Sequence, residues 1–165
     1  MSIRFNADEV LEMAEKIEAN AVIFYRKAAG LKQSKRDSEF LLSLAEMEVG
    51  HQRIFATMRK ELSDKEKEST AYDPMGEGSL YLAALADSRG GEGMPSITDQ
   101  LKGTETIAEV LRTAVELEKK AVLFYLGVRD MVPESLGKDR IDRIIGEEKS
   151  HVVVLTQYLT RATQK

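Results

Sequence analysis

The sequence contains no cysteine. Disulfide bonds, zinc sites with thiolate ligands and iron–sulfur clusters held by cysteine are therefore excluded. Any metal that this protein binds must be held by oxygen atoms and by the ring nitrogens of its two histidines. Such ligands suit iron, manganese and zinc better than the metals that prefer thiolates.

Proline and aromatic residues are also scarce, with three prolines and 6% aromatic residues among 165, and this composition favours helices over a β-sandwich or barrel. No apolar run approaches the about eighteen residues that a membrane span requires, and the N-terminus lacks the apolar core of a signal peptide. The net charge is only -4, and no basic stripe suggests nucleic-acid binding. We expect one soluble domain over residues 1–165, cytoplasmic, with no nucleic-acid or membrane partner.

One short motif occurs twice in the sequence. Glu48 and His51 recur one hundred positions later as Glu148 and His151. Each pair belongs to a row of residues spaced three and four apart that is otherwise apolar, and such a row lies along one face of a helix. A glutamate and a histidine therefore occupy core positions twice.

The helices that precede these motifs are duplicated at the same distance. Asn6 with Glu9, and Thr106 with Glu109, form two capping-box patterns that mark helix starts. The first helix is expected to end near Gly30, at a position suited to a positive φ. We predict four helices over about 6–30, 37–62, from 106, and 138–162.

These features predict an all-α four-helix bundle made of two duplicated hairpins. Hairpin one covers about 6–62 and hairpin two about 106–162. The connector over 63–105 carries a predicted short helix at 79–88 and is long enough to cross the length of the bundle. We expect a homodimer, and the connector could also let hairpins exchange between its two chains.

The glutamates of each hairpin stand at one height. Glu18 and Glu48 lie fifteen residues on either side of the centre of the first turn, and Glu118 and Glu148 are related in the same way about Pro133. Because the rise per residue is constant, the members of each pair are level. If the hairpins pack through these rows, four carboxylates and two imidazoles meet in the core.

Such a cluster needs a counter-charge, because buried carboxylates repel one another and each loses its hydration. Two divalent cations balance the total charge of four carboxylates. One glutamate from each of two helices, plus Glu-x-x-His from each of the other two, is the ligand set of di-iron and di-manganese carboxylate proteins. A hydrogen-bonded polar network is the alternative, but it leaves at least two carboxylates without a partner.

The sequence resembles the rubrerythrin branch of the ferritin-like superfamily. The likeness rests on the pattern Ala-x-x-x-Glu-x-x-Ala-x-x-Phe-Tyr at 14–25 and 114–125 and on the two Glu-x-x-His motifs. It implies a centre of two Fe ions, with Mn or Zn as alternatives, and redox chemistry on peroxide or dioxygen. The implied metal ligands are Glu18, Glu48, His51, Glu118, Glu148 and His151.

The chain departs from typical rubrerythrins in two ways. It lacks their four-cysteine iron domain, so an electron donor must be a separate protein, or turnover needs none. Ala121 stands where the family usually has an additional glutamate, which makes the expected centre similar to the symmetric six-ligand centre of bacterioferritin-type proteins. A ferroxidase-like storage or delivery protein is the alternative function, and a structural bundle with an incidental metal is a third.

Two tyrosines are further candidates. Tyr25 and Tyr125 lie two turns beyond Glu18 and Glu118 in the same rows. Their hydroxyl groups are expected either to bond to a ligand carboxylate and take part in catalysis, or simply to lie in the core.

Acidic residues beside the rows are interpreted mainly as solvated. Glu46, Glu116 and Glu147 fall off the rows in helical phase. Glu15 is closer in phase and is an alternative ligand. The charged run 63–68 is interpreted as a solvated helix end.

Overall fold

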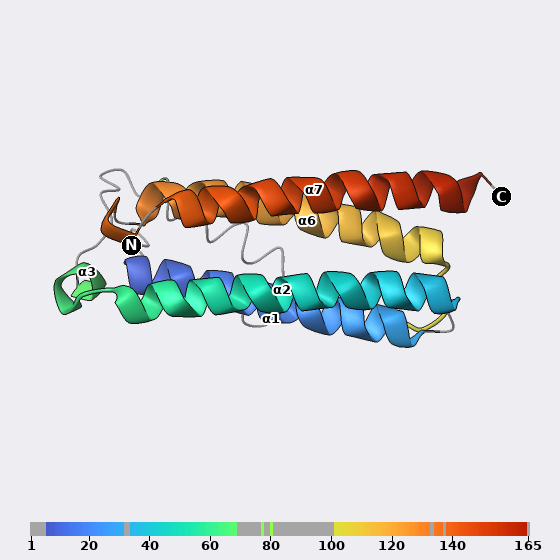
Figure 1. The fold of residues 1–165 in the computed structure, drawn as a ribbon, viewed down its shortest axis with the longest axis horizontal. Coiled ribbons are helices and arrows are strands. Elements are labelled where there is room, and N and C mark those ends of the chain that lie inside the picture. The colour runs from blue at the N-terminus through green and yellow to red at the C-terminus, as the bar shows by residue number, and fades with distance from the viewer. Residues whose placement is uncertain are drawn as a thin grey trace.

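Four long helices run side by side along one axis (Figure 1). The computed structural model describes residues 6–31, 34–68, 77, 80, 101–132, 134–136 and 138–164. A short helix follows α2, and a single 3-10 turn precedes α7. The elements are α1 (Ala7–Gly30), α2 (Lys35–Glu61), α3 (Asp64–Glu68), α6 (Ile107–Met131), η1 (Glu134–Leu136) and α7 (Asp139–Thr163). The predicted all-α four-helix bundle is confirmed.

The helices begin where side chains satisfy the free backbone N–H groups. The Asn6 side chain accepts from the Glu9 N–H at 2.9 Å, and the Glu9 carboxylate accepts from the Asn6 N–H at 2.9 Å. Thr106 and Glu109 make the same reciprocal pair at the start of α6, so both predicted capping boxes are confirmed. α2 begins at Lys35, two residues before the predicted start, because Ser34 caps it.

Two local predictions are wrong. α1 ends at Gly30 as expected, but the chain leaves the helix through an extended Leu31 with φ -65 and ψ 164, and Gly103 is the only described glycine with positive φ. The charged run 63–68 is not the end of α2, which stops at Glu61, because 64–68 forms the separate helix α3. The short helix predicted at 79–88 lies outside the described residues, apart from position 80.

The bundle consists of two hairpins. α1 packs chiefly on α2, and α6 packs chiefly on α7, while the hairpins meet through α1 with α6 and through α2 with α7. α2 ends and α6 begins at opposite ends of the bundle (Figure 1), as a long crossover requires.

The apolar core forms two clusters along the bundle axis. Phe55, Phe124 and Ile144 belong to one cluster, and Phe24 and Leu111 belong to the other. All five are at most 1% exposed, and burying a side chain of this size contributes roughly 1.5–3 kcal/mol. In the part of the chain that the structure describes, no helix is long and apolar enough to cross a bilayer. What separates the two clusters is a layer of polar side chains.

Candidate metal centre

The polar layer consists of the six residues that the two motifs and their preceding helices supply. They come from all four long helices of one chain, and each is between 0% and 3% exposed. Acidic residues are rarely buried to this extent unless they are paired or bind a metal. Among the described residues they are the buried charged and polar ones: Glu18, Glu48, His51, Glu118, Glu148 and His151.

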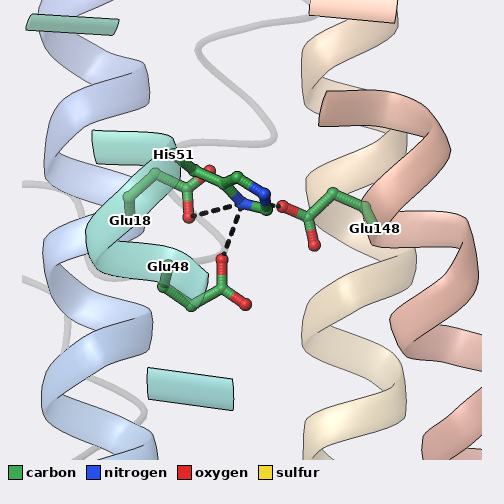
Figure 2. Close-up of side chains that lie close together, drawn as sticks. All are labelled: Glu18, Glu48, His51 and Glu148. Carbon is green, nitrogen blue, oxygen red and sulfur yellow. Dashed lines mark hydrogen bonds and ion pairs between the residues drawn. The ribbon is translucent and has the colours of Figure 1, made fainter. Parts of the chain in front are cut away.

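His51 faces three carboxylates with a single ring nitrogen. Its Nδ1 lies 2.8 Å from Glu148 Oε1, 3.0 Å from Glu48 Oε2 and 3.9 Å from Glu18 Oε2. Figure 2 shows the three carboxylates approaching this nitrogen from different helices. Because Nδ1 carries at most one proton, it can donate to only one of them. The other oxygens converge on a point where a cation would be held.

His151 has the same surroundings. Its Nδ1 lies 3.1 Å from Glu148 Oε2, 3.2 Å from Glu48 Oε1 and 3.9 Å from Glu118 Oε1. The two imidazole rings are nearly parallel, with centroids 5.8 Å apart and an interplanar angle of 25°. The duplication in the sequence therefore produces two similar pockets for a cation.

The four glutamates divide into two kinds. Glu48 and Glu148 each turn one carboxylate oxygen toward each histidine, whereas Glu18 and Glu118 face one histidine each. In each resulting group of four residues, the ligand atoms lie within 4.8 Å of one another. Two shared and two unshared carboxylates suit a pair of neighbouring cations.

Unsatisfied oxygen atoms distinguish this cluster from a hydrogen-bonded polar network. Among the described residues, Glu48 Oε1 and Glu148 Oε1 are buried and have no hydrogen-bond partner. Each lies at ion-pair distance from a histidine, but the angles exclude a hydrogen bond. A buried carboxylate oxygen in this state is costly, and a bound cation would satisfy it. The donor set of oxygen atoms with one nitrogen per position fits two divalent metals.

The environment separates the pKa values of the four carboxyl groups. Burial and the charges of Glu148 and Glu48 raise the pKa of Glu18 well above its usual value. Burial and the same two neighbours also raise the pKa of Glu118. Burial acts in the same direction on Glu48 and Glu148, but the close contacts of both carboxylates with His151 and His51 outweigh it and lower the pKa of both groups.

For the two histidines, burial changes the pKa in the opposite direction to that of the carboxyl groups. Burial alone would lower the pKa of each imidazole, but the close carboxylates of Glu148 and Glu48 raise the pKa of His51 to about 12 and that of His151 to about 10. Without a metal, the cluster therefore holds protons on both imidazoles. These protons occupy the Nδ1 positions that a metal would need, so protons and metals compete for one site.

Two tyrosines join the hairpins across the centre. The Tyr25 hydroxyl in α1 donates to Glu118 in α6, and the Tyr125 hydroxyl in α6 donates to Glu18 in α1. Both side chains are at most 1% exposed. Burial and the nearby Glu118 carboxylate raise the pKa of Tyr25 well above 10, so its hydroxyl stays protonated. Of the two expectations for these tyrosines, the structure shows the contact with the predicted ligand carboxylates.

One acidic neighbour differs from its expected role. Glu147 is not simply solvated, because its Oε2 lies 2.8 Å from His51 Nε2, although its side chain is 41% exposed. Helical phase places it off the row, but α7 lies beside α2 and brings it to the outer edge of the imidazole. The one sequence feature that sets Glu147 apart is a difference between the two repeats, because the matching residue of the first repeat is Met47.

The other acidic neighbours have ordinary partners. Glu46 pairs with Arg26 at 3.0 Å, and Glu116 pairs with Lys119 at 2.7 Å. Glu15, the alternative ligand, instead contacts Arg59 at 3.2 Å. The structure thus leaves Glu15 outside the cluster.

Comparisons with known proteins concern the fold. No protein-family model matches the chain, and no curated protein matches it. Among solved structures, the chain is similar to a candidate ferritin-like diiron-carboxylate protein from Thermotoga maritima, with a TM-score of 0.75 and 22% sequence identity over 97% of this chain and 98% of that chain. The protein thus has the ferritin-like four-helix bundle fold, and its buried glutamates and histidines fit the binding of two metal ions.

Proposed function

We propose that the protein is a rubrerythrin-like oxidoreductase that binds two iron ions and reduces peroxide or dioxygen, with manganese or zinc as alternative metals. The observation that supports this most strongly is the sharing of Glu48 and Glu148 between two histidines. A carboxylate with one oxygen directed to each metal position holds two ions close together. The six residues Glu18, Glu48, His51, Glu118, Glu148 and His151 are the proposed ligands.

The donor set favours a redox metal over a purely structural one. Carboxylate oxygens with one imidazole per metal suit iron and manganese, and structural zinc sites are usually closed by cysteine or histidine. Two ferrous ions held by these residues would supply one electron each, and with two protons these electrons would reduce one hydrogen peroxide to two waters. The chain's own task is to hold the metals and admit the oxidant.

The burial of the centre supports a small oxidant. The six proposed ligands are at most 3% exposed, so a bulky organic substrate has no access to them. Peroxide and dioxygen are small enough to reach such a site through side-chain motions. The closed packing on either side of the polar layer therefore supports a small oxidant as the proposed substrate.

The tyrosines hold the two unshared carboxylates. Tyr25 and Tyr125 each direct a hydroxyl proton at a glutamate of the opposite hairpin. The bond fixes the carboxylate rotamer, and it leaves a tyrosine in contact with a proposed ligand, where the side chain could pass an electron. We assign these residues the catalytic role that the sequence suggested.

Continued turnover needs a source of electrons. The chain has no cysteine and so carries no thiolate-bound iron centre of its own. We therefore propose a separate electron-donor protein as the partner. The alternative function, ferroxidase-like storage or delivery, needs no such partner.

Anaerobic loading followed by peroxide tests the proposal. The metal-free protein should bind two ferrous ions per chain, and one equivalent of peroxide should oxidise both, as followed by absorbance and by iron analysis. A double variant, His51→Ala with His151→Ala, should bind far less iron, whereas the control Glu46→Gln should match the unmodified protein. Uptake of iron far beyond two per chain in air would favour storage. Equal iron content in the double variant and the unmodified protein would exclude the proposed site.

A further inference from the structure

The duplicated sequence makes the two proposed metal positions nearly equivalent, but the far sides of the two imidazoles differ. His51 Nε2 contacts Glu147 Oε2 at 2.8 Å. His151 Nε2 is buried and, within the described part of the chain, has no hydrogen-bond partner. The two histidines thus face the centre in the same way and differ only in what supports them from outside.

The sequence explains this difference. Glu147 immediately precedes the shared ligand Glu148, and the matching residue before Glu48 is Met47. A thioether is only a weak hydrogen-bond acceptor, so Met47 offers nothing comparable to a carboxylate. A single difference between the repeats gives the His51 imidazole an outer carboxylate, whereas the His151 imidazole has no such partner among the described residues.

A carboxylate behind a metal-binding histidine acts on the metal through the ring. By accepting the Nε2 proton, it fixes the tautomer that presents the Nδ1 lone pair, holds the ring orientation and increases the basicity of Nδ1. Losing such a partner typically weakens metal binding by about 10- to 100-fold. Since the Glu147 side chain is 41% exposed, water competes for the carboxylate, and the smaller figure applies. Arg143, 3.8 Å from its other oxygen, limits its rotamers.

We propose that the two metal positions are inequivalent and that Glu147, as a positioning residue, makes the His51 position fill first, about tenfold more tightly than the His151 position. This inference rests on the proposed two-metal centre. It assigns that centre an order of loading, in which a chain with one metal carries it on the side of His51, Glu18 and the shared carboxylates.

Zinc titration of the metal-free protein, followed by calorimetry and by NMR, tests the order. Zinc is diamagnetic and does not change oxidation state. Because the chain has only two histidines, ¹⁵N-histidine labelling yields two rings, which a His151→Asn variant assigns. At one equivalent of zinc, a tenfold difference in affinity places the metal mainly at His51, so the Nδ1 signal of His51 should change at least about three times as much as that of His151.

Two reciprocal variants identify the cause. Glu147→Gln should weaken the first binding step about tenfold and make both rings shift together. Met47→Glu should instead strengthen the second step, because it places a carboxylate at the matching position behind His151. Glu46→Gln removes the same charge from a residue that pairs with Arg26, and it should change neither the affinities nor the order.

The outcomes separate the inference from the proposed function. Zinc binding in two separate calorimetric steps does not by itself show that the sites differ, because two nearby cations repel each other even in identical sites. If the unmodified protein binds two zinc ions but both rings shift in parallel, or if Glu147→Gln behaves like Glu46→Gln, the inference is overturned and the two-metal centre stands. If the unmodified protein binds no zinc and no ferrous ion, the proposed centre itself fails, and the inference with it.

Discussion

Loading the centre with two divalent metals at neutral pH should release protons from the protein. The pKa values of about 12 for His51 and about 10 for His151 mean that both imidazoles are protonated at pH 7. Each must lose a proton before its Nδ1 can bind a metal. Glu18 and Glu118 have raised pKa values as well, and each releases one more proton if it is protonated at the working pH.

The expected release is therefore about two to four protons per chain for two metals. At the upper figure the cluster is neutral both with and without the metals, because two divalent cations replace the four protons on Glu18, Glu118 and the two imidazoles. The same count fixes the pH dependence: the product of the two binding constants should rise by about two to four powers of ten for each pH unit near neutrality. Calorimetric titration with zinc in buffers of different ionisation enthalpy measures the number directly.

The stability of the metal-free protein should fall as the pH rises. For His51 and His151 the folded pKa lies above the unfolded value of 6.5, so their stabilisation is complete below pH 6.5 and is lost as the pH rises toward 10 and 12. Glu18 and Glu118, whose folded pKa values are raised as well, act in the same direction as the pH rises above the usual glutamate pKa of 4.5. The metal-loaded protein should show the opposite trend, because fewer protons compete with the metal.

Thermal unfolding between pH 6 and pH 9, with a chelator or with zinc, compares the two states. Surface groups with lowered pKa values, such as Asp8 and Asp142, have finished titrating below this range.

A release of nearly zero protons on zinc binding at pH 7 would refute the reasoning, since it would mean that the imidazoles are neutral in the metal-free protein. An unfolding temperature that rises with pH in the presence of chelator would contradict it as well.

Three further substitutions, with a fourth as an exposed control, test the packing of the bundle. Tyr125→Phe should preserve the fold but leave Glu18 without its donor, at about 1–3 kcal/mol of unfolding free energy in urea denaturation of the metal-free protein; no change would argue against the cross-hairpin bond. Ile144→Ala, at a position that is 0% exposed, should cost about 2–5 kcal/mol, while Val153→Ala, at 55% exposure, should stay within about 0.5 kcal/mol by the same measurement. Arg59→Ala removes ion pairs that join α2 to α1 and should cost about 1 kcal/mol, and high salt should shrink the difference between the two proteins.

The helices were predictable because their signals are local. The capping residues Asn6 and Thr106 lie within four residues of the groups that they satisfy, and the three-and-four spacing of apolar residues marks a face of each helix without reference to any neighbour. Equal distances from the hairpin turns then fixed the heights of Glu18 and Glu48. The end of α1 at Gly30 was predictable for the same reason, but its backbone angle was not, because Leu31 offered an extended exit.

The sequence by itself determined which six residues share one level of the bundle, because rise per residue and helical phase are the same in every α-helix. Only the tertiary structure decided how they divide into shared and unshared carboxylates, since that depends on how far α2 and α7 approach across the axis. It also decided that each tyrosine supports a glutamate of the opposite hairpin. Glu147 shows most clearly what the sequence alone does not determine. Its own helix places it off the core-facing row, and the neighbouring helix brings His51 to it.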